Sequence, residues 1–550
     1  MEWRFKDMAD DETRTETNLD EFFLAENDTF KNFAVSLVRE DVQNRLDAKN
    51  PELGSEVPAK VRYFLSTSGD DSDRKIAAWL KPLKEHCNSK QCVERMFGKS
   101  LDVFEKPLRY LTIECFNTTG LKGDPTQCNE SEEGIEKNDF YWMFRNVGRS
   151  GKSRLKGKRG SWGVGKIVYH LASRAMAYFC YSVSGGKTAF MGKTQLVPHW
   201  IAGQGKRDVG FFAEFSETGF ANPLQDASDL VAQDFCRDFN VSRTPFQSGV
   251  SIVIPFCRDD IRRETLVVST IRSYLWEILK GHVEITIETD DGKPAIALKK
   301  ETVKPFIKEF FPETSDNEKV DKEKFLAFHD FFAQIIIDRV QTDYIKEYTI
   351  AEPKNFSAVE VAQLFASEEE FNEAKASYQA GGIVQVIAPV TIRRREPDDT
   401  ITKLQDKFEV YLQKDEMQKP QISLIRDGLT ILDLEMHRGT LLRALTLIEH
   451  AEGEDAGPLS DFLRAAESPS HTDFSADRKA LANRYQKGGV LLKYVCDLMW
   501  KLASAFTDIE GQEDPDALMD WFGFEGDEAV KAFCELHDIL AIDNETEVAE

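Results

Sequence analysis

Three polar side chains at helical spacing lie in the segment EDVQNRLDA at residues 40–48. At about 100° per residue, Glu40, Asn44 and Asp47 fall in one sector of a helix. An amide can ligate a hard cation, and a carboxylate can hold or deprotonate a water. This face therefore fits a magnesium–nucleotide site, although an ordinary solvated helix face has the same pattern. The opposite side carries the residues expected to pack, namely Val35, Val38, Val42 and Leu46.

The elements that must position these side chains follow in order along the chain. Residues 108–116 predict a strand that runs into the turn-rich segment NTTGLKGD at 117–124. A glycine-rich segment at 160–165 precedes a predicted helix over 167–177, and Ser248-Gly249 opens a predicted strand over 250–255. Together with predicted strands over 178–184 and 188–191, this order predicts a two-layer α/β domain.

A second mixed α/β domain is predicted downstream. It has expected helices over 262–279, 325–345 and 476–507, and expected strands over 283–289, 295–298, 384–392, 407–412, 422–425 and 430–434. The resulting plan is an N-terminal arm over 1–20, a first domain over 21–260, a second over 261–510 and a C-terminal segment over 511–550.

The composition excludes several classes of protein. A length of 550 residues, 41% apolar residues and 38 Phe indicate packed cores rather than disorder. The net charge of −25 argues against general wrapping of nucleic acid. No apolar run approaches the roughly 20 residues of a membrane span. Nine scattered cysteines suit a reducing cytosol, so we expect a cytoplasmic protein with no membrane partner.

Charge is distributed unevenly along the chain. Residues 145–166, here called the basic lid, contain eight Lys and Arg and no Asp or Glu. Residues 508–550 contain fifteen Asp and Glu and one Lys, together with Trp521 and three Phe. The aromatic residues favour a short acidic helical segment over a disordered tail.

Two shorter phosphate-loop patterns compete for the basic lid. The sequence GSWGVGK at 160–166 nearly matches a Walker A loop, but Ile167 stands where the magnesium-binding hydroxyl belongs. The GKS at 151–153 has the Lys-Ser pair, but Asn146 replaces the first glycine. Neither pattern favours a P-loop NTPase. Backbone N–H groups at a helix start over 163–165 would nevertheless face phosphates, and Lys166 is the best phosphate-binding side chain.

Taken in order, the motifs resemble those of the GHKL ATPase superfamily, which includes DNA gyrase B subunits, MutL mismatch-repair proteins, MORC ATPases and sensor histidine kinases. The motifs are the acid-x3-Asn helix, the strand ending in TTG at 118–120, the Gly-x2-Gly-x-Gly box at 160–165 and the strand after Gly249. The resemblance covers about residues 20–260. It implies a Bergerat two-layer sandwich that binds ATP with Mg²⁺ and hydrolyses it.

The resemblance also implies roles for individual residues. Glu40 would be the general base, Asn44 the Mg²⁺ ligand and Asp47 a supporting hydrogen-bonding group. The pocket and the hinges of the lid would be shaped by Gly120, Gly160, Gly163 and Gly165. Further nucleotide contacts would come from Cys115, Asn117, Thr119, Trp162, Val164 and Lys166.

The chain departs from the family pattern at the residues that would bind the adenine base of the nucleotide. Cys115 stands where most members have an aspartate that accepts from the adenine amino group, and Asn117 replaces a glycine. Glu114 is adjacent but would point to the opposite face of its strand. A thiol is a weak hydrogen-bond partner. Three alternatives stay open: the base is held through water and Asn117 or Ser251, nucleotide selectivity is relaxed, or hydrolysis is slow.

The resemblance extends to the second domain, which looks like the transducer domain of gyrase B and MutL. Such a domain supplies a lysine to the γ-phosphate, for which Lys419 is the candidate and Lys414 an alternative. The segments RALTLIE at 443–449, LSDFLRAAE at 459–467 and PSHT at 469–472, with FRNVGRSGKS at 144–153, look like MutL-like ATPases of bacterial anti-phage defence clusters.

That likeness implies a nucleotide-linked homodimer that works with other defence subunits, including a nuclease, and contacts DNA through the basic lid. Other functions remain open from the sequence. Cys115 and Val250 also fit a scaffold with a degenerate nucleotide site, and a chaperone of the same superfamily is a further alternative. A histidine kinase would need a phosphoacceptor hairpin, which none of the nine His supports.

Overall fold

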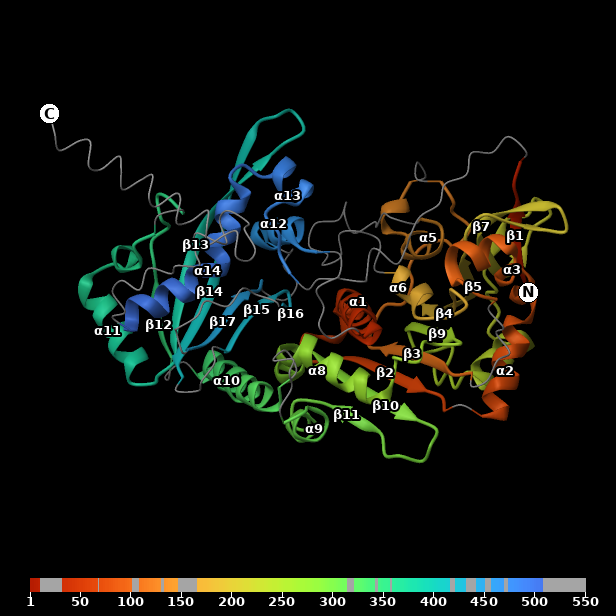
Figure 1. Ribbon diagram of the computed structural model, residues 1–550, viewed down its shortest axis with the longest axis horizontal. Helices are drawn as coiled ribbons and strands as arrows, with labels where there is room; N and C mark the ends of the chain where they lie inside the picture. Colours follow the sequence, from red (N-terminus) through yellow and green to blue (C-terminus); the bar gives the residue numbers. More distant parts are fainter. Residues whose placement is uncertain are drawn as a thin grey trace, which may run out of the picture.

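The computed structural model describes residues 1–9, 32–67, 69–100, 108–129, 133–146, 166–313, 321–341, 345–356, 359–415, 421–431, 442–450, 457–468 and 473–507. Over these residues the chain builds two mixed sheets, which lie side by side along the long axis of the molecule (Figure 1). Helices pack on both sheets, so the chain is a mixed α/β protein as the sequence predicted.

The larger sheet has eleven strands, and its main path runs β1-β7-β5-β4-β9-β3-β2-β10-β11, with β6 and β8 both paired to β7. All its pairs are antiparallel except β2 with β10. The strands are β1 (Glu2–Asp7), β2 (Ala59–Leu65), β3 (Tyr110–Phe116), β4 (Ala177–Ser184), β5 (Lys187–Gln195), β6 (His199–Ile201), β7 (Gln204–Phe215), β8 (Ala221–Asn222), β9 (Gly249–Pro255), β10 (Val283–Thr289) and β11 (Ile296–Leu298).

The helices of this first region are short except for two. They are α1 (Phe33–Asp47), α2 (Asp70–Leu80), α3 (Lys84–Cys87), α4 (Lys90–Cys92), α5 (Asp139–Phe144), α6 (Ile167–Leu171), α7 (Leu230–Asp238) and α8 (Arg263–Lys280). Asn32 caps α1 by accepting a hydrogen bond from the backbone N–H of Ala34 at 2.9 Å. α1 packs against α6, α8 and β2, and α8 also packs against β10.

α1 is enclosed on more sides than its sequence pattern predicted. Val35, Val38 and Val42 are buried as expected, but Glu40 on the polar side is only 8% exposed. α8 packs along this helix, and Arg39 also reaches the second sheet: it donates to Ser273 Oγ of α8 at 3.3 Å and to the carbonyl of Thr430 in β16 at 3.5 Å. Only the last turn of the polar side, with Asn44 and Asp47, stays half-buried.

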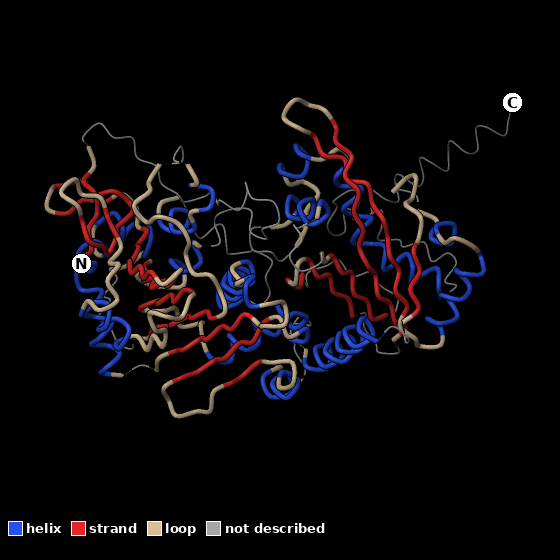
Figure 2. Tube along the Cα trace, turned by 180° about the vertical axis from the view of Figure 1, so that it is seen from behind, coloured by secondary structure: helices blue, strands red, loops and turns tan. Residues whose placement is uncertain are grey.

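The second sheet has six strands in the order β12-β13-β14-β17-β15-β16. The long β13–β14 hairpin extends beyond the other strands (Figure 2). The strands are β12 (Lys346–Thr349), β13 (Val384–Arg395), β14 (Ile401–Lys414), β15 (Gln421–Arg426), β16 (Leu429–Ile431) and β17 (Leu442–Ile448). The helices of this region are α9 (Val303–Phe310), α10 (Lys322–Gln341), α11 (Glu368–Gln379), α12 (Pro458–Ala466), α13 (Lys479–Arg484) and α14 (Gly488–Thr507).

Long-range pairing changes several elements from the sequence expectation. Residues 2–7, expected in an arm, form edge strand β1 on β7, and β10 and β11 lie beyond residue 260 yet complete the first sheet. The expected helix over 167–177 ends at Leu171. The expected helix over 476–507 is split into α13 and α14, because Tyr485 pairs with Arg394 of β13. The expected acidic helical segment over 511–550 lies outside the described residues.

None of the helices in the described ranges combines the length and the apolar character needed to cross a membrane.

Candidate functional site

The last turn of α1 is fastened to the turn that follows β3. The backbone N–H of Thr119 donates to the carbonyl of Ala48 at 2.9 Å, and the N–H of Asn50 donates to the carbonyl of Asn117 at 3.0 Å. Lys49 and Thr118 form an antiparallel bridge between these hydrogen bonds. The end of α1 that carries Asn44 and Asp47 therefore lies against the predicted 117–120 turn.

Two residues of this turn have left-handed backbone. Asn117 has φ of +62°, a conformation for which glycine is best suited and which asparagine tolerates better than most residues. The Asn117 side chain also donates to the carbonyl of Pro58 at 2.8 Å. Gly120 has φ of +73°, and a Cβ there would overlap the carbonyl of Val183 in β4. Residue 120 therefore has to be glycine for two reasons: its backbone is left-handed, and a side chain would collide with β4.

The thiol of Cys115 is 1% exposed and is engaged by protein groups. Its Sγ accepts from the backbone N–H of Val250 at 3.3 Å, lies 3.4 Å from the Val250 carbonyl and lies 3.1 Å from Thr118 Oγ1. These contacts join the end of β3 to the start of β9. Cys115 therefore packs between β3 and β9 and makes weak hydrogen bonds there. It has no carboxylate that could accept a hydrogen bond from a nucleobase.

Glu114 points to the other face of β3, as strand alternation predicts. Its carboxylate is buried and accepts from Arg62 Nη1 at 2.8 Å, Ser242 Oγ at 2.7 Å and Ser251 Oγ at 3.0 Å. The backbone N–H groups of Ser242 and Arg243 donate to it as well, at 3.0 and 3.1 Å. Neither Glu114 nor Ser251 is thus placed to replace the missing aspartate.

Arg243 is a buried residue that the sequence analysis did not single out. Its guanidinium donates to Ser251 Oγ at 3.0 Å, to the carbonyls of Gln247 and Ser248 at 2.9 Å each, and to the carbonyls of Cys115 and Val250. It therefore ties the loop before β9 to the end of β3. No local pattern marks this arginine, because its acceptors come together only when β3 and β9 pair.

A buried polar cluster lies on α1 beneath the predicted site and was also missed. Asp41 accepts from Arg45 Nη2 at 2.5 Å, Tyr169 Oη at 2.8 Å and Tyr63 Oη at 3.1 Å. Burial acts to lower the pKa of Arg45, but the nearby Asp41, Cys115 and Tyr169 outweigh burial and raise it well above its usual value. The i, i+4 spacing of Asp41 and Arg45 was the available sequence signal.

Lys166 lies at the end of the basic lid and binds backbone carbonyls. Its ammonium donates to the carbonyls of Trp142 and Asn146, and the buried Lys193 donates to the carbonyl of Phe144 at 3.0 Å. Burial, with the neighbouring Lys193, holds the pKa of Lys166 well below its usual value, and burial lowers the pKa of Lys193 to about 8. Lys166 therefore links the two ends of the lid, and both lysines satisfy carbonyls at or near the end of α5.

Several predicted site residues lie outside the described residues. They are Gly160, Trp162, Gly163, Val164 and Gly165 of the lid, and Lys419. Their expected contacts with phosphates stay predictions, as does the phosphate role of Lys166.

The residues present could bind the magnesium ion of a Mg–nucleotide complex, but they do not form the usual contacts to its nucleobase. Glu40, Asn44 and Asp47 supply the carboxylate and amide oxygens that Mg²⁺ prefers, on successive turns of α1. The base side does not fit in the usual way, because the Cys115 thiol already contacts Val250 and Thr118. Among the described residues, no group of three or more His, Cys, Asp or Glu side chains converges as a metal site.

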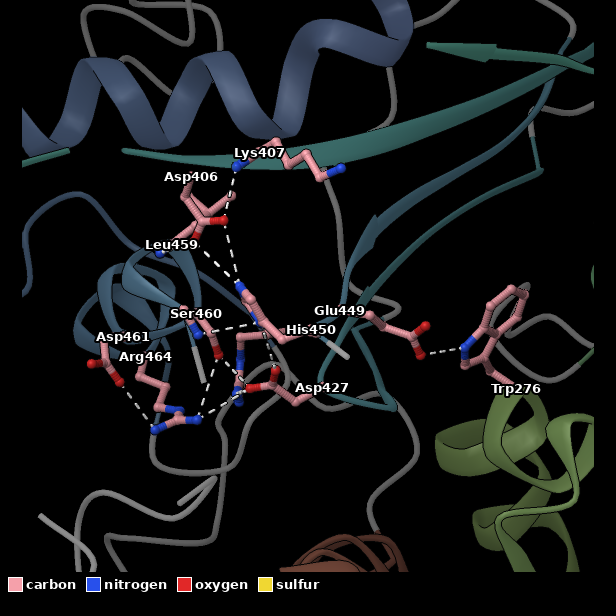
Figure 3. Close-up of polar contacts among 12 residues, drawn as sticks. Trp276, Asp406, Lys407, Asp427, Glu449, His450, Leu459, Ser460, Asp461 and Arg464 are labelled. Carbon is pink, nitrogen blue, oxygen red and sulfur yellow. Dashed lines mark hydrogen bonds and ion pairs between the residues drawn. The ribbon is translucent and has the colours of Figure 1, made fainter. Parts of the chain in front are cut away.

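A second charged cluster lies in the other region, where β14, β17 and α12 meet (Figure 3). His450 Nε2 lies 3.4 Å from Asp406 Oδ2, and His450 Nδ1 lies 4.0 Å from Asp427 Oδ1. Asp427 also accepts from Arg464 at 3.1 Å and from Ser460 Oγ. The contact with Asp406, together with the nearby carboxylate of Asp427, raises the pKa of His450 to about 10. The Gly457 N–H, 3.2 Å from Nδ1, favours a neutral ring, but two carboxylates outweigh one amide.

Comparison with known proteins identifies no family by sequence: no family model and no curated protein matches. The chain is similar to a solved structure described as the 43K ATPase domain of Thermus thermophilus gyrase B in complex with an aminocoumarin. The two are 10% identical, and the match covers 89% of this chain and 92% of that chain with a TM-score of 0.26. A likeness of this size decides neither the fold nor the activity.

Proposed function

We propose that this chain is a GHKL-type conformational switch that binds Mg-ATP beside α1 and hydrolyses it. The observation that carries the proposal is the fastening of α1 to the turn after β3, through Ala48 with Thr119 and Asn50 with Asn117. This fastening brings the Asn44 end of the helix to the turn that contains Gly120. The acid-x3-Asn helix and the TTG turn must lie together in this way to form one nucleotide site. The left-handed Asn117 supports it further, because the family pattern has glycine there.

Each residue would have a distinct task in this site. Asn44 would hold Mg²⁺, whose positive charge would offset that of the phosphates, and Asp47 would support the site through hydrogen bonds. Glu40, which is only 8% exposed, would orient and deprotonate the attacking water. The basic lid would cover the phosphates, with backbone N–H groups from residues 163–165.

The wider role that we propose is in a bacterial anti-phage defence complex. Nucleotide binding would join two protomers, hydrolysis would release them, and a partner protein would supply nuclease activity. This part of the proposal rests on the motif resemblance of the basic lid and of the segments between residues 443 and 472.

One observation favours a second candidate function, a scaffold protein that binds nucleotide but does not hydrolyse it. Cys115 offers its thiol to Val250 and Thr118 rather than a carboxylate to a base. A site with a weak hold on the base would be expected to bind nucleotide loosely and with little discrimination.

The test compares wild type with Asn44→Ala and Glu40→Ala, using Asn372→Ala at an exposed position of α11 in the second region as a control. We expect Asn44→Ala to weaken Mg-dependent ATP binding by about tenfold or more. We expect Glu40→Ala to keep binding and to lose turnover by roughly 10²–10⁴-fold. Unchanged ATP binding in Asn44→Ala would remove the site assignment. Wild-type binding without turnover would select the scaffold.

A further inference from the structure

A cavity of about 400 Å³ lies in the second region, between the β13–β14 hairpin and the start of α14. Its walls come from the segment before the hairpin, from both hairpin strands, from α12 and from the α13–α14 junction. Its volume falls within the roughly 300–1,000 Å³ of small-molecule sites. None of its lining residues belongs to α1 or β3, so it is separate from the site described above.

Four cationic side chains line this cavity: Lys354, Arg393, Lys403 and Lys487. All four are exposed, and within the described ranges none has an ion pair or a side-chain hydrogen bond to another part of the chain. By contrast, the neighbouring Arg394 is paired with Glu396 at 2.8 Å. In a chain with net charge −25, four unpaired cations around one cavity form a local site for an anion.

The one carboxylate in the lining, Glu352, offsets only part of this positive charge, because it faces four cations. Glu352 accepts from the backbone N–H of Thr391 at 2.6 Å and from Thr391 Oγ1 at 2.7 Å. Both of its oxygens are therefore engaged in holding the segment before the hairpin onto β13. The start of α14 adds further positive potential, because the positive end of a helix dipole lies at its N-terminus, next to Lys487.

The rest of the cavity wall is a mixture of uncharged polar residues with apolar and aromatic ones. Phe356, Phe462 and Tyr485 line it, and the rings of Phe462 and Tyr485 lie 5.1 Å apart with an interplanar angle of 82°. Phe462 and Tyr485 are 0% and 6% exposed, so they form the packed floor of the cavity. The half-buried Phe356 is the ring that a flat base can contact, and the nearby cations can bind phosphate oxygens. The cavity thus offers cations for phosphate groups and one accessible aromatic ring for a base.

We propose that this cavity is a nucleotide-binding site, which takes either a free nucleotide or the terminal nucleotide of a single strand. The phosphates would contact Arg393, Lys403 and Lys487, and the base would lie against Phe356. Figure 1 shows α12 and α13 beside the hairpin, so an occupant would contact elements of both the sheet and its helical cover. This inference is independent of the function proposed for α1.

The test measures fluorescence anisotropy with the full chain in EDTA, which removes the Mg-dependent binding expected at α1. One probe is a fluorescent ATP and the other a fluorescent oligothymidylate of about ten nucleotides. The variant Arg393→Glu/Lys403→Glu reverses two charges at the cavity, and Lys407→Glu makes the same kind of change outside the cavity on the same strand. We expect the double variant to bind about tenfold or more weakly, Lys407→Glu to bind as wild type, and inorganic phosphate to compete.

The two probes distinguish the sources of the ligand. Binding of ATP that the double variant loses assigns the cavity to a free nucleotide, and binding of the oligonucleotide alone assigns it to a strand end. The inference is overturned if neither probe binds to wild type, or if Lys407→Glu weakens binding as much as the double variant. It is also overturned if Asn44→Ala abolishes the binding in EDTA while the double variant keeps it.

Discussion

At the scale of single residues, Asp41 is the charge on which α1 depends. It is 0% exposed and accepts from Arg45, Tyr63 and Tyr169. Asp41→Asn keeps the size but leaves the Arg45 guanidinium buried without its counter-charge. We expect the free energy of unfolding, measured in urea, to fall by about 3–5 kcal/mol.

The control for this prediction is Asp71→Asn on α2, which breaks an exposed pair with Arg74 and Lys75. It should change stability by about 1 kcal/mol or less. The double variant Asp41→Asn/Arg45→Met should recover part of the loss, because the unpaired cation is gone. An Asp41→Asn protein as stable as the Asp71→Asn protein would show that the cluster does not hold α1.

His450 should make stability depend on pH. Asp406 and Asp427 raise its pKa to about 10 in the folded chain, above the roughly 6.5 of an unfolded chain. The protonated ring therefore stabilises the fold fully below about pH 6.5, and this contribution is lost as the pH rises through about 10. The difference in free energy of unfolding between wild type and His450→Gln should shrink over that range, as measured by denaturant titration at several pH values. A difference that stays constant with pH would contradict the assigned charge.

At the scale of elements, the turn after β3 depends on its contact with β4. Gly120→Ala should cost more than Gly186→Ala, although the two glycines have φ of +73° and +76°. A Cβ at residue 186 meets nothing within 4 Å, so that variant measures the backbone strain alone, about 1–2 kcal/mol. A Cβ at residue 120 also overlaps the Val183 carbonyl and should cost about 1–3 kcal/mol more. Equal losses in thermal unfolding would mean that the turn moves away from β4 without cost.

The elements that the sequence predicted well are those with a local signal. β3 and β9 are rich in aliphatic, β-branched and aromatic residues, and α8 and α10 have clear helical periodicity, so each was found within a few residues. The motif on α1 was also visible locally. By contrast, the partners of Asp41 include Tyr63, 22 residues away, and Tyr169, 128 residues away, and no local pattern links them. The split between α13 and α14 likewise depends on pairing with β13, which only the folded chain provides.

At the scale of the whole molecule, α8 links the two sheets. Its Tyr274 hydroxyl donates to the carbonyl of Arg39 in α1 at 2.5 Å, and its Trp276 Nε1 donates to Glu449 at 2.6 Å. Glu449 follows β17 and precedes His450, and Figure 3 shows its carboxylate directed at Trp276. A displacement of α1 could therefore be passed to the end of β17 through a single helix, as the proposed switch would need.

Glu449 is the residue whose substitution would break the contact between α8 and the end of β17. Its carboxylate is shared by Trp276, by Lys280 at 3.1 Å and by Arg339 at 3.3 Å, so Glu449→Ala removes one acceptor from three donors. We expect a loss of about 1–3 kcal/mol in stability and a calorimetric transition that separates into two, because the regions no longer unfold together. The control is Glu396→Ala, which removes a carboxylate paired with Arg394 on the hairpin, away from α8. If Glu449→Ala keeps one transition as sharp as that of the control, the two regions are coupled through the Arg39 contacts with Ser273 and Thr430 instead, and the switch would act through α1 directly on β16.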